Sequence, residues 1–285
     1  MKVAVFGKTG QVATELARRA PNGVSIETFG RNRADFSKPD QVATVAQDID
    51  AHAVINAVAY TAVDKAEEEP ELANLVNGTS VARLAEVCSE RALPLVHIST
   101  DYVFEGGGTT PWTPDAPTNP QGAYGVSKNL GERAIQDLNA KDQVILRTSW
   151  VFSAHGNNFV KTMLKYGAER PELRVVADQI GGPTPAADIA DACLTIAQAL
   201  TKGQTGGTYH FSGAPDTSWA DFANEIMSQA ELPARIAAIP TTEWPTPAMR
   251  PLNSRMDCGT LKQDFGIDRP DWRIGLAAVL KELQG

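Results

Sequence analysis

Apolar positions along the first half of the chain alternate between two patterns. Short, almost continuously apolar runs predict buried strands over residues 2–6, 24–29, 53–56, 93–99 and 143–147. Between them, apolar residues recur every three or four positions, which predicts helices over residues 11–20, 37–48, 71–91 and 124–138. Strands separated by helices at this spacing are joined by right-handed crossovers and form a parallel sheet covered on both faces. The pattern therefore predicts an α/β fold with a doubly wound, Rossmann-type parallel sheet.

The second half of the chain is less regular. Its patterns predict helices over residues 158–168, 186–200, 219–229 and 274–283, and strands over residues 173–176 and 208–211. Four prolines between residues 239 and 251 predict an extended loop there. Because no flexible linker separates the two halves, we expect a smaller C-terminal α/β region over residues 151–285, partly interleaved with the sheet domain of residues 1–150.

Composition and charge narrow the class of protein. Hydrophobic residues make up 42% of the 285 residues, enough for a sizeable core, and acidic residues outnumber basic ones by 34 to 26. Because the sequence has no Lys/Arg-rich block, a nucleic-acid partner is not expected. No apolar run is long enough to cross a membrane, and a strand that begins at residue 2 leaves no room for a signal peptide, so we expect a cytoplasmic protein. Three widely spaced cysteines predict isolated buried thiols.

The segment GKTGQVA, residues 7–13, follows the first predicted strand and opens the first predicted helix. Its GxxGxxA spacing is typical of a dinucleotide-binding turn, in which glycines let the backbone approach a pyrophosphate and a small residue lets the helix pack on the strand. Free N–H groups at the helix N-terminus then hold the phosphates. The spacing alone is weak evidence. Its position in the alternating pattern predicts that residues 1–150 bind NAD(P), with contacts from Gly7, Thr9, Gly10, Gln11 and Val12.

The choice of nicotinamide depends on the residues after the second strand. An acidic residue there would hold the ribose of NAD, but the sequence has Arg31, which suits the 2′-phosphate of NADPH. NADPH is therefore favoured and NADH stays open, because an arginine on a solvated loop would give the same pattern. Further cofactor contacts are expected from residues that follow the second and third strands: Asp35, Phe36, Ala57, Ala59 and Tyr60.

Tyr124 and Lys128 stand four positions apart in a predicted helix, which places both side chains on one face. A lysine ammonium beside a phenol lowers the tyrosine pKa from about 10 towards neutral pH. A tyrosine in this position can give a proton to a carbonyl oxygen as hydride reaches the carbon. The spacing is common by chance, but Thr100 adds a hydroxyl at the carboxyl end of the fourth predicted strand, where ligands bind in parallel sheets. The three residues together predict a reductase site.

These motifs resemble the extended short-chain dehydrogenase/reductase superfamily, and within it the dTDP-4-dehydrorhamnose reductases. The resemblance extends over almost the whole chain through FGKTGQV (6–12), YTAVDKAE (60–67), STDYVF (99–104), RTSWV (147–151), GNNF (156–159) and residues 250–255. It implies an NAD(P)H-dependent enzyme that reduces the 4-keto group of dTDP-4-dehydro-6-deoxy-L-mannose to give dTDP-L-rhamnose, by hydride transfer to C4. The expected partner is the dTDP-linked deoxysugar, and the expected state is a monomer or a homodimer.

The resemblance also implies roles for individual residues. Tyr124 would be the proton donor, Lys128 its electrostatic partner and a ligand of the cofactor ribose, and Thr100 the hydroxyl that orients the ketone. The guanidinium groups near the end of the chain would suit the nucleotide phosphates. The residues expected to contact substrate are Thr100, Asp101, Trp150, Asn158, Arg250, Asn253 and Arg255.

Some members of this branch bind Mg²⁺ through carboxylates shared between subunits. Glu15 matches one of these carboxylates, whereas residues 185–187 offer no acid near the second and Asp188 is only adjacent. The sequence therefore leaves Mg²⁺ open and predicts no metal ligand. The four histidines lack metal-ligand spacing, and His97, in the fourth predicted strand, is expected to be a core residue with a satisfied ring.

Two other kinds of function stay open at this point. A nucleotide-sugar dehydratase of the same scaffold needs an acid and a base beside the sugar, and related dehydratases follow the threonine with Asp-Glu, whereas here Asp101 is followed by Tyr102. An epimerase is compatible with the sequence. The other alternative is an NAD(P)-binding regulatory subunit without turnover, although the presence of Thr100, Tyr124 and Lys128 favours catalysis.

Overall fold

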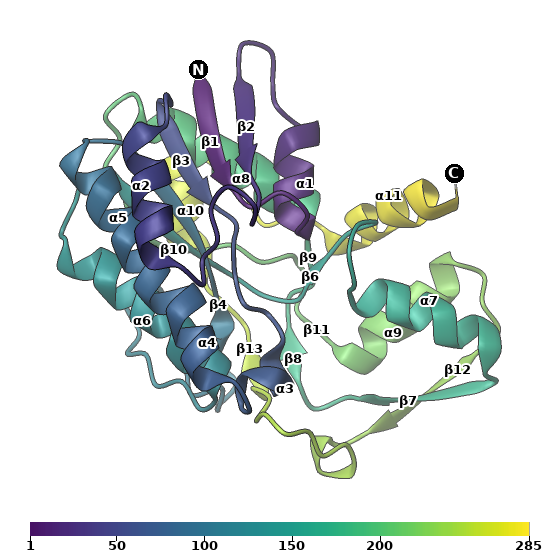
Figure 1. Ribbon diagram of the computed structural model, residues 1–285. Helices are drawn as coiled ribbons and strands as arrows, with labels where there is room; N and C mark the ends of the chain where they lie inside the picture. Colours follow the sequence, from purple (N-terminus) through teal and green to yellow (C-terminus); the bar gives the residue numbers. More distant parts are fainter. Residues whose placement is uncertain (285) are drawn as a thin grey trace.

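Six parallel strands form the central sheet of the computed structural model, which describes residues 1–284 (Figure 1). Their order across the sheet is β10-β5-β4-β3-β1-β2, and every neighbouring pair is parallel. The strands are β1 (Lys2–Phe6), β2 (Ser25–Phe29), β3 (Ala53–Asn56), β4 (Leu95–Thr100), β5 (Gln143–Thr148) and β10 (Gly207–His210). The predicted doubly wound α/β sheet is therefore confirmed. Its strand order reverses between β1 and β3, where such sheets bind ligands at their carboxyl edge.

Alternate residues of β1 face opposite sides of the sheet, as the two-residue period of a strand requires. Val3 and Val5 belong to one buried apolar cluster, and Ala4 and Phe6 belong to the other. Each cluster is closed by its own helices. The first is covered by α1 (Gln11–Arg18) and α8 (Ala186–Leu200), and the second by α2 (Pro39–Asp48), α5 (Ser80–Glu90) and α6 (Ala123–Asp137).

Residues after 151 contribute to both the sheet layer and a smaller region, seen at the lower right of Figure 1. In the sheet layer, α8 packs on α1, β10 extends the sheet beside β5, and α10 (Gly259–Phe265) packs on β10. The smaller region has its own core, in which Phe222 meets Phe152 and Trp272. Its elements are the parallel pair β7 (Glu172–Val176) and β12 (Arg235–Ile239) with α7 (Phe159–Glu169), α9 (Trp219–Gln229) and α11 (Trp272–Gln284).

Two-residue strands join the two regions. β6 (Val151–Phe152) pairs with β9 (Thr184–Pro185), and β8 (Ile180–Gly181) lies between β11 (Thr217–Ser218) and β13 (Asn253–Ser254). Segments this short show no period in the sequence, so the pattern of apolar positions did not predict them.

Two predicted elements differ from the structure. The helix predicted over residues 71–91 is a continuous run of α4 (Pro70–Asn74), a π-helical turn η1 (Leu75–Thr79) and α5, and it is preceded by a short helix α3 (Val63–Ala66) that was not predicted. The loop predicted over residues 239–251 begins inside β12 and includes a 3₁₀ turn, η3 (Thr241–Glu243). Strand β12 was missed because its sequence, RIAAI, shows no clear alternation and its partner β7 lies more than 50 residues away.

Two smaller expectations can be compared with the structure. Cys88, Cys193 and Cys258 are buried with free thiols, as predicted. Within residues 1–284, none of the helices combines the length and the hydropathy needed to cross a membrane.

Candidate active site

The turn between β1 and α1 has the backbone that a phosphate-binding turn needs. Gly7 has φ +116°, and a Cβ there would lie 3.3 Å from the Cβ of Ala13 and 3.4 Å from the backbone of Ala57, so a larger residue would be strained and crowded. Gly10 begins α1 without any side-chain cap, and the first turn of this helix has no acidic residue. The N–H groups at the start of α1 therefore stay available to an anion.

A cavity of about 480 Å³ lies at the carboxyl edge of the sheet, beside this turn. The predicted catalytic residues Thr100, Tyr124 and Lys128 all line it. So do three groups of predicted binding residues. These are Thr9, Gly10, Gln11 and Val12 of the turn, Ala57 and Ala59 after β3, and Asp101 and Trp150. The structure therefore brings segments from residues 9 to 157 into one cavity.

Thr100 ends β4 and lies next to a 3₁₀ turn, η2 (Asp101–Val103), so its hydroxyl is held by the two residues that follow it. Its Oγ1 donates to Oδ1 of Asp101 at 3.0 Å and accepts from the backbone N–H of Tyr102 at 3.2 Å. Burial raises the pKa of the Asp101 carboxyl to about 6, and its Oδ2 has no hydrogen-bond partner. An unpaired buried acceptor beside the cavity is available to a ligand.

Tyr124 lies in the first turn of α6 and is buried, with its ring edge-on to that of Tyr102. Burial raises the pKa of its phenol above the usual value, and the neighbouring Thr100 hydroxyl offsets this only partly. The predicted lowering of this pKa by Lys128 is therefore wrong. The physical reason is that desolvation dominates, because removing the phenol from water disfavours its charged form.

Lys128 lies one helical turn beyond Tyr124 but directs its amine towards β4. Its Nζ donates to the carbonyl oxygen of Ile98 at 2.7 Å and lies 3.2 Å from Nε2 of His97. The side chain is 1% exposed, and burial lowers its pKa to about 8. Lys128 is thus a partly charged group at neutral to mildly alkaline pH.

Five of the predicted cofactor residues do not line this cavity: Gly7, which belongs to the turn beside it, and Arg31, Asp35, Phe36 and Tyr60. Arg31 is 82% exposed and faces Asp35 at 3.4 Å, while Asp35 itself accepts hydrogen bonds from Ser37. Phe36 is buried against Phe6, and Tyr60 donates its hydroxyl to Glu69 at 2.9 Å.

A second cavity of about 790 Å³ adjoins the first, because Tyr102 lines both. Its wall includes Arg250, whose Nη2 donates to Oδ2 of Asp64 at 2.7 Å, and Trp219, which stacks at 3.7 Å on Trp150. Trp150 has φ +49°, a conformation uncommon for a bulky residue, and it lines the first cavity. The two rings therefore connect the two cavities.

The three other predicted substrate residues line neither cavity. Asn158 caps α7 through Lys161 N–H and donates to Oε1 of Gln11 at 3.0 Å. Asn253 is buried and donates to the carbonyl oxygens of residues 107 and 110, while Arg255 donates to Oδ1 of Asn253 at 3.0 Å. These side chains hold loops together inside the protein.

Comparison with known proteins gives the family. The chain matches the model of a family described as RmlD substrate binding domain, over residues 1–285. The chain belongs to this family. It is 43% identical to the dTDP-4-dehydrorhamnose reductase of Escherichia coli (strain K12), in an alignment that covers 99% of this chain and 98% of the relative. The superfamily branch and the oxidoreductase class predicted from the motifs are therefore confirmed.

Solved structures give the same result for the fold. A dTDP-4-dehydrorhamnose reductase from Clostridium acetobutylicum ATCC 824 superposes with a TM-score of 0.93 at 33% identity and covers 100% of both chains. The enzyme from Bacillus anthracis str. Ames, solved in complex with NADP, superposes with a TM-score of 0.91 at 35% identity and covers 99% of both.

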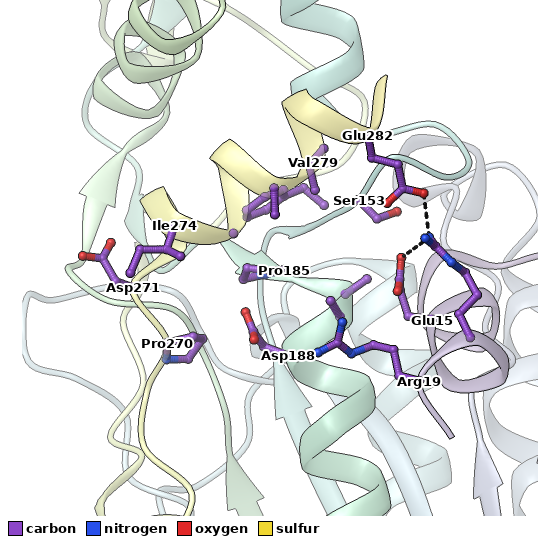
Figure 2. Close-up of a pocket in the computed structure, with 16 residues that line it drawn as sticks. Glu15, Arg19, Ser153, Pro185, Asp188, Pro270, Asp271, Ile274, Val279 and Glu282 are labelled. Atoms are coloured by element: carbon purple, nitrogen blue, oxygen red, sulfur yellow. Dashed lines mark hydrogen bonds and ion pairs between the residues drawn. The ribbon is translucent and has the colours of Figure 1, made fainter. Parts of the chain in front are cut away.

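The Mg²⁺ that the sequence leaves open can be tested against the residues near Glu15. Figure 2 shows Glu15 and Glu282 turned towards one guanidinium, which belongs to Arg18. Arg18 Nη1 lies 3.2 Å from Glu15 and 2.6 Å from Glu282, and His155 lies 3.1 Å from Glu15. Asp188 is not part of this group. A guanidinium that already neutralises both carboxylates leaves no open set of oxygen ligands, so the described residues do not fit Mg²⁺.

Sequence reasoning missed two side chains at the site. Asp64 pairs with Arg250 at the second cavity, and its position inside the YTAVDKAE segment was the only indication available. His97 is buried with both ring nitrogens in contact, as predicted, but its contact with Lys128 was not foreseen.

Proposed function

We propose that the protein reduces the 4-keto group of dTDP-4-dehydro-6-deoxy-L-mannose with NADPH and so forms dTDP-L-rhamnose. One observation carries this proposal: an uncapped phosphate-binding turn and the side chains of Thr100, Tyr124 and Lys128 line one cavity. The full-length similarity to enzymes named dTDP-4-dehydrorhamnose reductase supports the choice of substrate.

NADPH is the proposed cofactor, with NADH as a weaker substitute. The relative from Bacillus anthracis was solved with NADP, and the N–H groups at the start of α1 suit its pyrophosphate. Arg31 is proposed to meet the 2′-phosphate, since its guanidinium is exposed beside the second strand. When bound, this cofactor supplies the hydride. Asp35, Phe36 and Tyr60 are proposed to shape the adenosine end, and Ala57 and Ala59 to line the path of the ribose and pyrophosphate.

Three side chains carry out the remaining chemistry in this proposal. Thr100 orients the ketone oxygen, because its own hydroxyl is held by two neighbours. Tyr124 gives its phenolic proton to that oxygen as the carbon accepts hydride, and burial keeps the phenol protonated until then. Lys128, when charged, stabilises the phenolate that forms.

The second cavity is proposed to hold the nucleotide. Arg250 suits a phosphate group, although it must exchange or share its contact with Asp64 to bind one. Trp150 is proposed to pack against the sugar between the two cavities, with Asp101 beside it. Asn158, Asn253 and Arg255 are proposed to support the loops that carry these contacts, since their polar groups already bond within the chain.

The deciding experiment supplies the purified protein with the 4-keto sugar nucleotide and either NADPH or NADH. We expect one cofactor oxidised for each sugar reduced, and NMR of the product should identify dTDP-L-rhamnose. An epimerised or dehydrated product without net cofactor oxidation would replace the proposal by one of the related enzymes. Cofactor binding without any turnover would favour a regulatory subunit.

A further inference from the structure

A chain of buried polar contacts continues from Lys128 into the sheet. The amine of Lys128 lies 3.2 Å from Nε2 of His97, and Nδ1 of His97 lies 3.0 Å from Nδ2 of Asn56. The amide of Asn56 is anchored in turn, because its Oδ1 accepts the backbone N–H of Val58 at 3.0 Å. Asn56 and His97 are fully buried and Lys128 is 1% exposed, so water competes poorly for these contacts.

The chain of contacts fixes which nitrogen of His97 carries a proton. A backbone N–H can only donate, so the oxygen of Asn56 must face Val58 and its NH₂ must face the ring. Nδ1 of His97 is therefore the acceptor. Burial, and then the neighbouring Lys128, hold the pKa of His97 well below its usual value, so the ring is neutral and keeps one proton. That proton belongs on Nε2, the nitrogen that faces Lys128.

We propose that His97 is a positioning residue. Asn56 holds the His97 proton on Nε2, and this N–H points at the amine of Lys128. It thereby fixes the position of the amine and favours its neutral form. An ammonium group has three donors and no acceptor, so an opposing N–H disfavours it. A neutral amine has a lone pair that accepts the N–H and can still donate to the carbonyl oxygen of Ile98. The histidine therefore acts in the same direction as burial, which lowers the pKa of Lys128 to about 8.

The other groups around Lys128 do not cancel this effect. Glu132, on the same helix, favours the charged lysine, but it is held by the buried guanidinium of Arg147 at 2.6 Å. Tyr124 is a phenol that burial keeps neutral, and the Asp101 carboxyl accepts a hydrogen bond from the Thr100 hydroxyl. The π-helical turn η1, which also packs on α6, has no titratable residue.

Charged side chains on the remaining helices that contact α6 are engaged elsewhere or reach the surface. On α3, Asp64 pairs with Arg250 and Lys65 pairs with Glu69. On α4 and α5 they are exposed or half-buried: Glu71, Arg83, Glu86 and Glu90.

The first test reads the tautomer in the unmodified protein and needs no activity. With ¹⁵N-labelled histidine, correlations between the ring nitrogens and the carbon-bound ring protons distinguish the Nε2–H from the Nδ1–H form. The spectrum of His97→Gln identifies which signals belong to His97. We expect the Nε2–H form at pH 7. A ring protonated on Nδ1, or on both nitrogens, would overturn the proposal.

The second test switches the tautomer and follows Lys128. In Asn56→Asp a carboxylate can still accept from Val58 N–H but now also accepts from Nδ1–H, so Nε2 becomes an acceptor for the ammonium. The added negative charge acts in the same direction, and opposite charges at this range shift a pKa by roughly 1–3 units. We expect the alkaline limb of kcat/KM, where Lys128 loses its proton, to move up by about one pH unit.

The control for that variant is Asn22→Asp, which adds the same charge at an exposed turn and should leave the limb in place. If the His97 proton moves to Nδ1 in Asn56→Asp but the alkaline limb of kcat/KM does not shift, His97 does not influence the proton affinity of Lys128, and the proposal is refuted. The kinetic part depends on the proposed reductase activity, whereas the tautomer does not. If the protein shows no reductase turnover but His97 is the Nε2–H tautomer, the result counts against the proposed function alone.

Discussion

The two cavities of this protein differ in how their polar groups are held. In the cavity at the sheet edge, Thr100, Asp101, Tyr124 and Lys128 are all buried, and strand β4, the turn η2 and helix α6 fix their backbones. In the second cavity, the charged groups are half-exposed, as in the pair between Arg250 and Asp64 with side chains 21% and 44% exposed. Rigid, desolvated groups have perturbed pKa values, whereas exposed pairs can exchange partners at low cost.

This contrast is expected if the first cavity carries out the chemistry and the second binds the nucleotide. Chemistry requires fixed geometry and tuned proton affinity, which burial provides. Recognition of a large nucleotide requires side chains that can release one partner and take another. If the two functions are separated in this way, substitutions in the first cavity should strongly affect turnover or its pH dependence. Substitutions in the second cavity should modestly affect substrate affinity.

The strongest test of the first cavity is Tyr124→Phe. Removing the phenolic proton should slow turnover by roughly 10²–10⁴-fold while NADPH still binds. Steady-state rates and cofactor titration by fluorescence measure the two effects separately. Tyr209→Phe removes another tyrosine hydroxyl, which donates to Asp264 away from this cavity, and should leave turnover unchanged. Unchanged turnover in Tyr124→Phe would remove the proton donor from the proposed mechanism.

Asp101 tests whether burial in this cavity has an energetic consequence. Its pKa is raised to about 6, so the folded protein binds this proton more tightly than the unfolded chain does. The contribution of Asp101 to stability therefore falls as pH rises from about 4 to about 6. We expect the stability of Asp101→Asn relative to the parent to increase by up to about 3 kcal/mol between pH 4 and pH 8.

Urea unfolding at several pH values measures that difference. Asp137→Asn, at an exposed position, is the matched control and should give a difference that is nearly independent of pH. A flat profile for Asp101→Asn as well would mean that the carboxyl is not desolvated in solution.

The sequence predicted the first cavity better than the second for a physical reason. The spacing of Tyr124 and Lys128 on a helix, and the position of Thr100 at a strand end, are local features, and the parallel sheet brings strand ends together at one edge. By contrast, the contacts of Asn253 with the backbone of residues 107 and 110 span more than 140 positions. No local pattern could indicate that this amide is already satisfied within the chain.

The same distinction explains the misjudged electrostatics of Tyr124. A four-residue spacing indicates that lysine and tyrosine share a face, but it does not show where the amine points. The amine instead contacts His97 and Ile98, about 30 residues earlier in the chain, and burial dominates the pKa of the phenol. Desolvation depends on all the surrounding segments at once, so it becomes visible only in the folded structure.

In the second cavity, Arg250→Ala should raise KM for the sugar nucleotide by roughly tenfold with little change in kcat, as expected for one charge-assisted phosphate contact. The modest size follows from the pair with Asp64, which must be broken on binding. Arg83→Ala, which removes an exposed arginine paired with Glu86 on α5, outside the lining of this cavity, is the control. A large fall in kcat for Arg250→Ala would place this side chain in the chemical step and break the contrast between the cavities.

The smallest effect is expected at Arg31, because its guanidinium is 82% exposed and its interaction with a phosphate is screened by water and salt. Arg31→Ala should weaken NADPH binding by roughly three- to tenfold and leave NADH binding almost unchanged. Arg33→Ala is the matched control, since Arg33 lies two residues away on the same loop but pairs with Glu27. Dissociation constants measured for both cofactors at low and at physiological salt provide the comparison. Equal losses for NADPH and NADH would remove Arg31 from the 2′-phosphate contact, and the preference for NADPH would then have to come from another group.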